Sequence, residues 1–264
     1  MIELKDDIII ASDSFIDRLF PKERMPFLID PRIFKALAKK GLWSHGKSLF
    51  AGMEYTEYGM AKWLNNVGNT MGEVYGHSAK RYWWHGSCNL SPSSAPINRK
   101  PDLVLLGRDY FEFLEATLQR VDWLRIRSFA EVTTEPRVPA RMIPTINAKA
   151  YLSFILQFDR RFATSLSFIG SGEYSLTVTD HQGQIRYTSS LKSGLEPAQR
   201  FLTILAFFMF GNDTDIGLDS HFIRDPKTDR LVAVNVNDQR YELEEGIYTV
   251  ESLVGRGTNV WVVS

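Results

Sequence analysis

Apolar positions along the chain follow two periods, one close to 3.6 residues and one close to two. The helical period predicts two short helices within 14–43 and longer ones at about 54–67, 147–162 and 197–210. The two-residue period predicts strands at 101–107, 123–133, 166–170, 174–180, 184–190, 231–236, 240–244 and 258–263. These elements mix without regular alternation. The sequence therefore predicts an α+β fold with one mixed, mainly antiparallel sheet and flanking helices.

Turn and cap residues place several of the predicted ends. Asp30 followed by Pro31 is typical of a helix start, with the aspartate as N-cap and the proline in the first turn. The stretch DHQG at 180–183 predicts a hairpin turn. Gly211 and Asn212 are expected to end the apolar helix before them as a left-handed cap pair.

The strand over 123–133 alternates clearly. One face is expected to carry the even-numbered residues Leu124, Ile126, Ser128, Ala130 and Val132. The other face is expected to carry Arg125, Arg127, Phe129, Glu131 and Thr133.

Composition narrows the class of protein. The 264 residues are 44% hydrophobic, which is enough for one large domain or two small ones. Thirty-one basic residues balance 31 acidic ones, so no global field attracts nucleic acid or an anionic membrane, and nucleic-acid contact would need a local patch. The single cysteine, Cys88, cannot form an internal disulfide.

Targeting signals are not visible in the sequence. The N-terminal MIELKDDIII is no signal peptide, and the longest apolar run, 204–210, is far shorter than the roughly 20 residues a bilayer requires. We therefore expect a cytoplasmic or nuclear protein without membrane contact.

Three acidic residues are candidates for a metal site: Glu57, Asp102 and Glu131. Glu57 shares a predicted helix face with apolar residues, where a carboxylate needs a partner, a metal or a proton. Asp102 and Glu131 lie on neighbouring predicted strands and can hold one Mg²⁺, which would activate water and stabilise charge on a phosphate. The structural alternative is a turn role for Asp102 and a pair between Glu131 and Arg127.

Pro101 and Asp102, together with the triplet EVT at 131–133, resemble the motif of PD-(D/E)xK nucleases. In that motif a lysine follows the glutamate by two residues, but here the position holds Thr133. The resemblance implies a restriction-nuclease-like core in which Asp102, Glu131 and Gln157 are catalytic, with Gln157 at the place of a supporting glutamine.

Four arginines lie near this motif in the sequence. We expect Arg160 and Arg161, on the same predicted helix as Gln157, to hold phosphate. Together with Arg125 and Arg127 they would line a basic groove if the chain binds nucleic acid.

A longer set of motifs appears in one order: KPDLVLL, a tryptophan-led strand ending in AEVT, QFDRRF, DHQG and GRGTNVW. This order resembles the N-terminal region of fungal-type protein kinases. The resemblance covers about residues 95–264 well and the first ninety residues more loosely. It implies a nuclease-like domain over 1–245, helical over about 1–75, and a hairpin over 246–264 that opens a kinase N-lobe.

The glycine loop of that hairpin contains Gly255, Gly257 and Thr258, which the resemblance implies as phosphate-binding residues. The third glycine position holds Val260. The kinase lysine, catalytic loop and metal-binding segments follow this loop in the family and do not occur in 1–264. We therefore expect that this chain alone is not a working kinase and that ATP is not its cofactor. The structural alternative is a hairpin that completes the local sheet.

Two other patterns are weaker. The stretch from Gly41 to Ser48 fits the spelling of a phosphate loop, but a helix-like segment precedes it instead of a strand, so Gly41 is better interpreted as a helix C-cap. The stretch RYWWHG at 81–86 is either an aromatic platform for single-stranded nucleic acid or part of the core.

Three hypotheses follow. The first is a non-catalytic binding or regulatory module, a pseudoenzyme relative of fungal-type kinases. The second is a Mg²⁺-dependent nuclease. The third is an effector-like protein that interacts with another protein. The partner is accordingly a protein or a nucleic acid.

Overall fold

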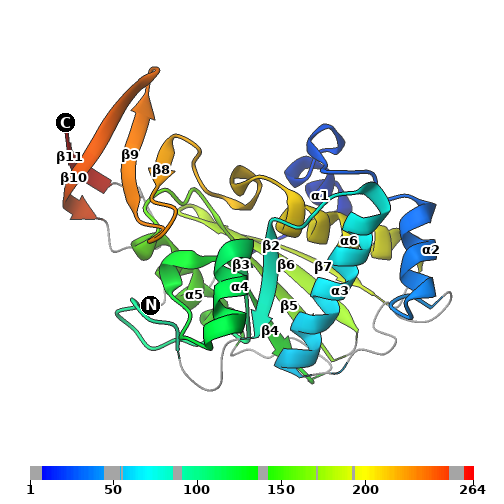
Figure 1. Ribbon diagram of the computed structural model, residues 1–264. Helices are drawn as coiled ribbons and strands as arrows, with labels where there is room; N and C mark the ends of the chain where they lie inside the picture. The colour runs from blue at the N-terminus through cyan, green and yellow to red at the C-terminus, as the bar shows by residue number, and fades with distance from the viewer. Residues whose placement is uncertain are drawn as a thin grey trace.

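The computed structural model describes residues 8–44, 54, 56–85, 91–135, 142–170, 172–191, 194–249 and 259–264. Two sheets and six α-helices organise this part of the chain (Figure 1). No helix within these ranges is long and apolar enough to cross a membrane.

The larger sheet has seven strands and carries the core. In spatial order they are β1 (Ile8–Ile10), β7 (Gly183–Ser190), β6 (Glu173–Asp180), β5 (Ala163–Ile169), β4 (Ile126–Thr133), β3 (Leu103–Gly107) and β2 (Arg81–His85). The pairs β1–β7 and β4–β5 are parallel, and the other four pairs are antiparallel. The predicted α+β fold with a mixed, mainly antiparallel sheet is confirmed.

Four helices cover one face of this sheet: α1 (Asp13–Leu19), α2 (Pro31–Lys39), α3 (Glu57–Tyr75) and α6 (Leu195–Phe210). Helix α6 is the centre of this layer, and its residues from Ile204 to Phe210 are all buried. Its Phe201 ring packs 5.9 Å from Trp63 of α3 and 6.2 Å from Phe168 of β5. Burial of such large aromatic side chains is the main stabilising term in this core.

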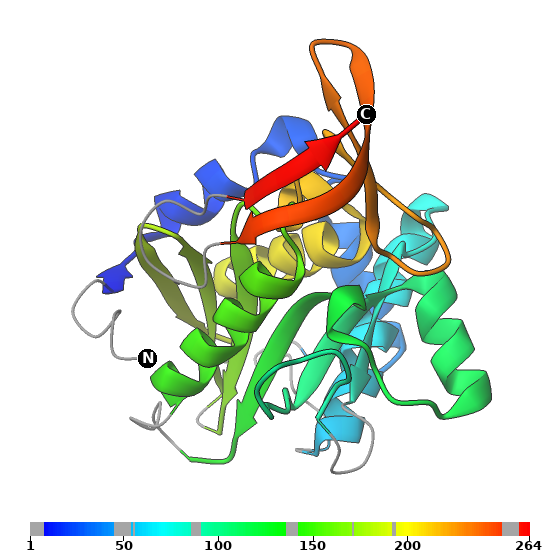
Figure 2. The same ribbon diagram turned by 90° about the vertical axis from the view of Figure 1, so that its left-hand side faces the viewer.

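The opposite face is covered by α4 (Arg108–Thr117) and α5 (Met142–Leu156), and α5 crosses the sheet in the foreground of Figure 2. A smaller apolar cluster lies beneath them. It includes Trp84 of β2, Trp123 and Leu152. Trp83 and Trp84 are both buried on β2, so the tryptophan pair belongs to the core and not to an exposed aromatic platform.

A second, four-stranded sheet extends from the first (Figure 1, upper left). Its order is β11 (Asn259–Val263), β10 (Gln239–Thr249), β9 (Leu231–Val236) and β8 (Phe222–Arg224). The expected C-terminal hairpin is present as the antiparallel pair β10–β11. The predicted domain boundary at 245/246 falls inside β10.

Predictions that depend on a few neighbouring residues are confirmed at three places. Asp30 caps α2 by accepting a hydrogen bond from the backbone N–H of Arg32 at 2.8 Å, and Pro31 occupies the first turn. Gly41 follows α2 with φ = 72°, as expected of a helix C-cap glycine. Asp180 accepts hydrogen bonds from the backbone N–H groups of Gln182 and Gly183 and closes the β6–β7 hairpin.

The expected left-handed end of α6 is wrong. Gly211 has φ = −63°, and the chain leaves the helix in an extended conformation. A Cβ at Gly211 would lie 2.6 Å from the carbonyl oxygen of Phe207. Glycine is therefore required there by a close approach and not by a positive φ.

The expected face of Ile126 is also wrong. The β3–β4 register shifts between Leu105 and Leu106, which places a bulge in β4 at Arg127. As a result Ile126 packs with the cluster under α4 and α5, whereas Ala130 packs against α3 and α6. A bulge breaks the two-residue period and redirects the side chain at that point.

Candidate functional site

Two of the predicted carboxylates lie next to each other at one end of the larger sheet. Leu103 of β3 pairs with Ala130 of β4, and Asp102 and Glu131 are the next residues along each chain. Directly opposed residues of an antiparallel pair have their Cβ atoms about 5 Å apart on one face. Oδ2 of Asp102 accepts a hydrogen bond from the backbone N–H of Val132 at 2.7 Å, which fixes this carboxylate beside Glu131.

Glu131 has a cationic partner that the sequence motif did not indicate. Nζ of Lys149, from the middle of α5, donates a hydrogen bond to Oε1 of Glu131. Both residues are buried: Lys149 is 1% exposed and Glu131 is 7% exposed. The amine therefore reaches the carboxylate from the helix above the sheet, at a position 16 residues after Thr133 in the chain.

Burial changes the acidity of this carboxyl group. The pKa of Glu131 is raised from 4.5 to about 7, mainly by desolvation; the charge of Lys149 opposes this shift and the charge of nearby Asp102 adds to it. The neighbouring position on β5 is Ser167, whose hydroxyl is buried and has no hydrogen-bond partner in the part of the chain described. The site is thus a dry carboxylate–amine pair beside a second carboxylate.

Glu57 does not bond to Asp102, Glu131 or Lys149 but to another lysine. It is the first residue of α3, and both of its carboxylate oxygens accept from Nζ of Lys100, at 3.2 and 3.3 Å. Among the described residues no group of three or more His, Cys, Asp and Glu side chains is placed to hold a metal ion. A Mg²⁺ site built from Glu57, Asp102 and Glu131 remains a prediction from the sequence.

Gln157 does not lie on a helix face, because α5 ends at Leu156 and not at 162 as predicted. Its amide donates to the carbonyls of Trp123 and Ile126, each at 2.8 Å. Its carbonyl oxygen accepts from Arg160, which is 5% exposed and also donates to the carbonyl of Ile216. Gln157 and Arg160 therefore tie the end of α5 to the start of β4.

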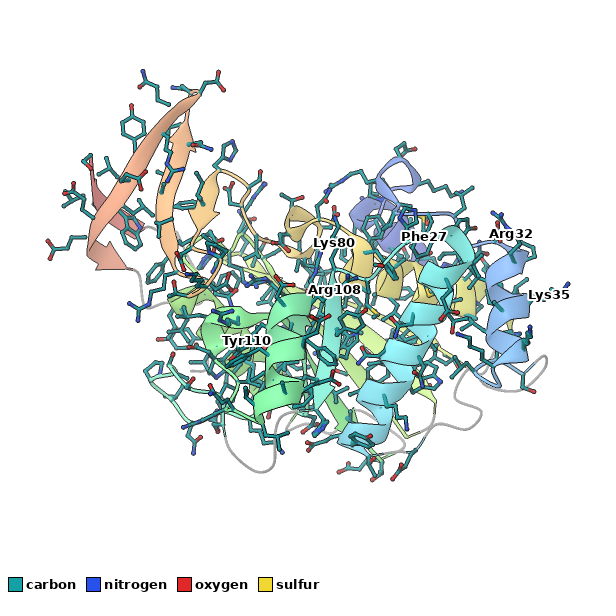
Figure 3. The ribbon with its side chains drawn as sticks, in the orientation of Figure 1. Phe27, Arg32, Lys35, Lys80, Arg108 and Tyr110 are labelled. Carbon is teal, nitrogen blue, oxygen red and sulfur yellow. The ribbon has the colours of Figure 1, made fainter. Side chains whose placement is uncertain are left out.

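The four arginines of the expected basic groove do not gather on one surface. Arg160 is buried, and Arg161 is exposed next to it. Arg127 forms a two-pronged ion pair with Asp229, at 2.6 and 2.8 Å. The guanidinium of Arg125 lies 4.4 Å from the ring centre of Tyr110 on α4, which Figure 3 labels.

Comparison with known proteins connects this geometry to a family. The sequence matches the family described as fungal protein kinase over residues 100–264, more than half of the chain. The chain belongs to the fungal protein kinase family. No curated protein and no solved structure matches it.

The family match includes both the carboxylate pair and the second sheet. It begins two residues before Asp102 and ends with β11. The glycine-loop residues Gly255, Gly257 and Thr258 fall outside the described residues, as do residues 45–48 of the stretch that fits the spelling of a phosphate loop. The strands on either side of the glycine loop, β10 and β11, pair from Leu243 with Val263 to Thr249 with Asn259.

Lys149 is a residue of the candidate site that the sequence of this fungal protein kinase family member did not lead us to expect. One signal was available: α5 is strongly apolar, and Lys149 stands between Ala148 and Ala150, all three buried. A lysine in such a run needs a buried anion. The nuclease motif places its lysine two residues after the glutamate, whereas here the amine comes from the following helix.

Proposed function

We propose that this chain is a non-catalytic binding or regulatory module of the fungal protein kinase family. The observation that carries the proposal is the buried pair between Glu131 and Lys149. A carboxylate that is neutralised by an ammonium group and excluded from water is a poor ligand for Mg²⁺. Asp102 already accepts a backbone hydrogen bond, and Thr133 brings no charge, so the nuclease-like motif serves structure here.

A second function is favoured by the same lysine. In a metal-dependent nuclease an amine beside the metal-binding glutamate orients the attacking water. Lys149 supplies such an amine from α5, which removes the objection raised by Thr133. Binding of Mg²⁺ at Asp102 would then draw Glu131 away from Lys149. An effector-like role gains no support from a particular contact.

One experiment separates the two functions. Mg²⁺ and Mn²⁺ are titrated by calorimetry into the wild-type chain, Asp102→Ala and the exposed control Asp109→Ala, and the same samples are assayed for cleavage of DNA and RNA. For a non-catalytic module we expect identical heats for all three chains and no cleavage. Metal binding and cleavage that are present in the wild type and in Asp109→Ala but lost in Asp102→Ala would contradict the module and establish the nuclease.

A further inference from the structure

A pocket lies at the opposite end of the larger sheet from the carboxylate pair. It has a volume of about 340 Å³ and is lined by Lys80, Arg81, Gly107, Arg127, Gly211, Asn212 and Asp213. The strand β3 separates the two places, with Asp102 before its first residue and Gly107 as its last, about 17 Å at 3.4 Å per residue. None of Asp102, Glu131 and Lys149 lines this pocket.

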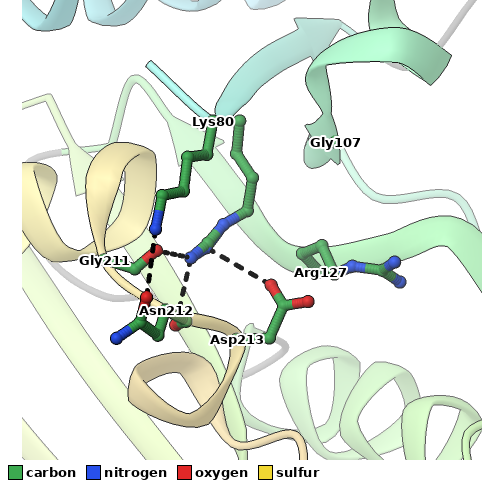
Figure 4. Close-up of a pocket in the computed structure, with 7 residues that line it drawn as sticks. Lys80, Gly107, Arg127, Gly211, Asn212 and Asp213 are labelled. Atoms are coloured by element: carbon green, nitrogen blue, oxygen red, sulfur yellow. Dashed lines mark hydrogen bonds and ion pairs between the residues drawn. The ribbon is translucent and has the colours of Figure 1, made fainter. Parts of the chain in front are cut away.

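The chain builds the pocket from four segments that meet in Figure 4, one of which is β4 with Arg127. Lys80 and Arg81 stand at the start of β2, Gly107 ends β3, and residues 211–213 follow the C-terminus of α6. A Cβ on Gly107 would meet no atom within 4 Å, so this backbone borders open space. Such a volume is at the small end of the range for ligand pockets, roughly 300–1,000 Å³.

Arg81 is held rigidly with part of its donor capacity unused. It is 2% exposed, and its Nε donates to the carbonyl of Phe208 at 3.1 Å. Its Nη2 donates to the carbonyls of Gly211 and Asn212, at 2.6 and 3.1 Å. Its Nη1 is buried and makes no hydrogen bond within the described residues. The nearest anion to Nη1 is Oδ1 of Asp213, at 3.6 Å, and the Asp213 side chain is 57% exposed.

The charges around this guanidinium are not balanced. Among the described residues, Nζ of Lys80 donates one hydrogen bond, to the amide oxygen of Asn212 at 3.0 Å, and an ammonium group has three N–H donors. Arg127 also lines the pocket, with its guanidinium paired to Asp229. Burial lowers the pKa of Arg81 to about 10, which indicates that its neighbours compensate its charge only in part. An anionic ligand in the pocket would balance the charge of Arg81 and accept a hydrogen bond from its Nη1.

We propose that this pocket binds a phosphate monoester, with the phosphate on Nη1 of Arg81 and Nζ of Lys80. The free N–H groups of Nη1 can donate a charge-assisted hydrogen bond to a phosphate oxygen, and the lysine adds a point charge. The volume leaves room for a small group esterified to the phosphate. Asp213 is the competing anion, and its exposed side chain can turn away when the phosphate enters.

The test uses two variants with opposite expected effects, since a purely structural role would not produce them. Lys80→Met removes a donor from an exposed side chain and should weaken binding about tenfold. Asp213→Asn removes the competing charge and should tighten binding. Lys35→Met is the matched control, because Lys35 is an exposed lysine on α2, far from Lys80 in Figure 3.

The probes are inorganic phosphate, O-phosphoserine and a phosphoserine peptide with its unphosphorylated counterpart, each titrated into the full chain by calorimetry. We expect saturable binding of the three phosphate compounds, weakened by salt and by Lys80→Met, tightened by Asp213→Asn and unchanged in Lys35→Met. Tighter binding of the peptide than of O-phosphoserine would identify a modified protein as the source of the phosphate, and the reverse would identify a small ester. No saturable binding at millimolar phosphate, or binding unaffected by both pocket variants, would overturn the proposal.

Discussion

At the scale of single residues, the chemistry of this protein depends on how buried charges are neutralised. Glu131 and Lys149 are each more than nine-tenths buried and bind each other. Removing one member of such a pair leaves the other as an uncompensated buried charge, whereas replacing both leaves none. Any variant meant to report on Glu131 should therefore change Lys149 as well.

The raised pKa of Glu131 predicts a dependence of stability on pH. Its folded-state pKa of about 7 lies above the ordinary value of 4.5, so between these values the folded chain binds more protons than the unfolded chain. The contribution of this group to the free energy of unfolding must then fall as the pH rises from 4.5 to 7, and stay constant above that. Urea unfolding of the wild type at about pH 5, 6, 7 and 8 measures how the free energy of unfolding changes with pH.

The double variant Glu131→Gln with Lys149→Met provides the comparison, because it removes the titrating group without leaving a buried charge. The difference in unfolding free energy between wild type and double variant should shrink or reverse as the pH rises. Glu112→Gln, an exposed substitution on α4, should follow the wild type at every pH. A constant difference between wild type and double variant would show that Glu131 does not titrate in this range.

At the scale of elements, the contact between α3 and α6 is close because α3 carries glycines where the helices meet. A Cβ on Gly68 would lie 2.3 Å from the sulfur of Met209, the end of a flexible side chain. A Cβ on Gly72 would lie 2.4 Å from the carbonyl oxygen of His77 and 3.0 Å from the ring of Phe210. The tip of a methionine side chain can move aside, whereas a backbone carbonyl cannot. Gly68 should therefore tolerate an added methyl group better than Gly72 does.

Gly72→Ala should therefore destabilise the protein, by about 2 kcal/mol or more, although alanine is the better helix former. Gly68→Ala should cost less, because Met209 can change rotamer. Asn69→Ala, at an exposed position of the same helix, should be neutral or slightly stabilising. Chemical denaturation of the three variants tests the order. Equal stability of Gly72→Ala and Asn69→Ala would contradict the close approach.

What the sequence predicted at this scale was local. The cap of α2 at Asp30 and the β6–β7 turn at 180–183 depend on residues within three positions of each other, and both are confirmed. The bulge at Arg127 and the pair of Lys149 with Glu131 depend on other strands and helices, and the sequence pattern did not reveal them. The two-residue period assumes an unbroken ladder, and a motif of fixed spacing assumes that its amine comes from the same strand.

At the scale of the whole molecule, the two sheets are joined by buried ion pairs. Asp159, 3% exposed and just beyond α5, accepts hydrogen bonds from Arg224 of β8, one of them at 2.9 Å. Arg127 of β4 binds Asp229 in the turn between β8 and β9. The ring of Trp261 on β11 lies 5.5 Å from that of Phe158. These contacts connect the smaller sheet to the end of α5 and the start of β4.

Because few apolar residues of the smaller sheet are buried, the ion pairs should decide whether both sheets unfold together. Asp159→Ala leaves Arg224 without its main partner and should cost roughly 3 kcal/mol in the coupling of the sheets. In native-state hydrogen exchange, the amides of β8 and β9 should then exchange faster, while those of α6 keep their protection. Arg240→Gln breaks only the exposed pair with Glu242 and should leave both regions unchanged. Equal loss of protection in α6 and β9 would instead mean that the two sheets form one cooperative unit that Asp159 stabilises as a whole.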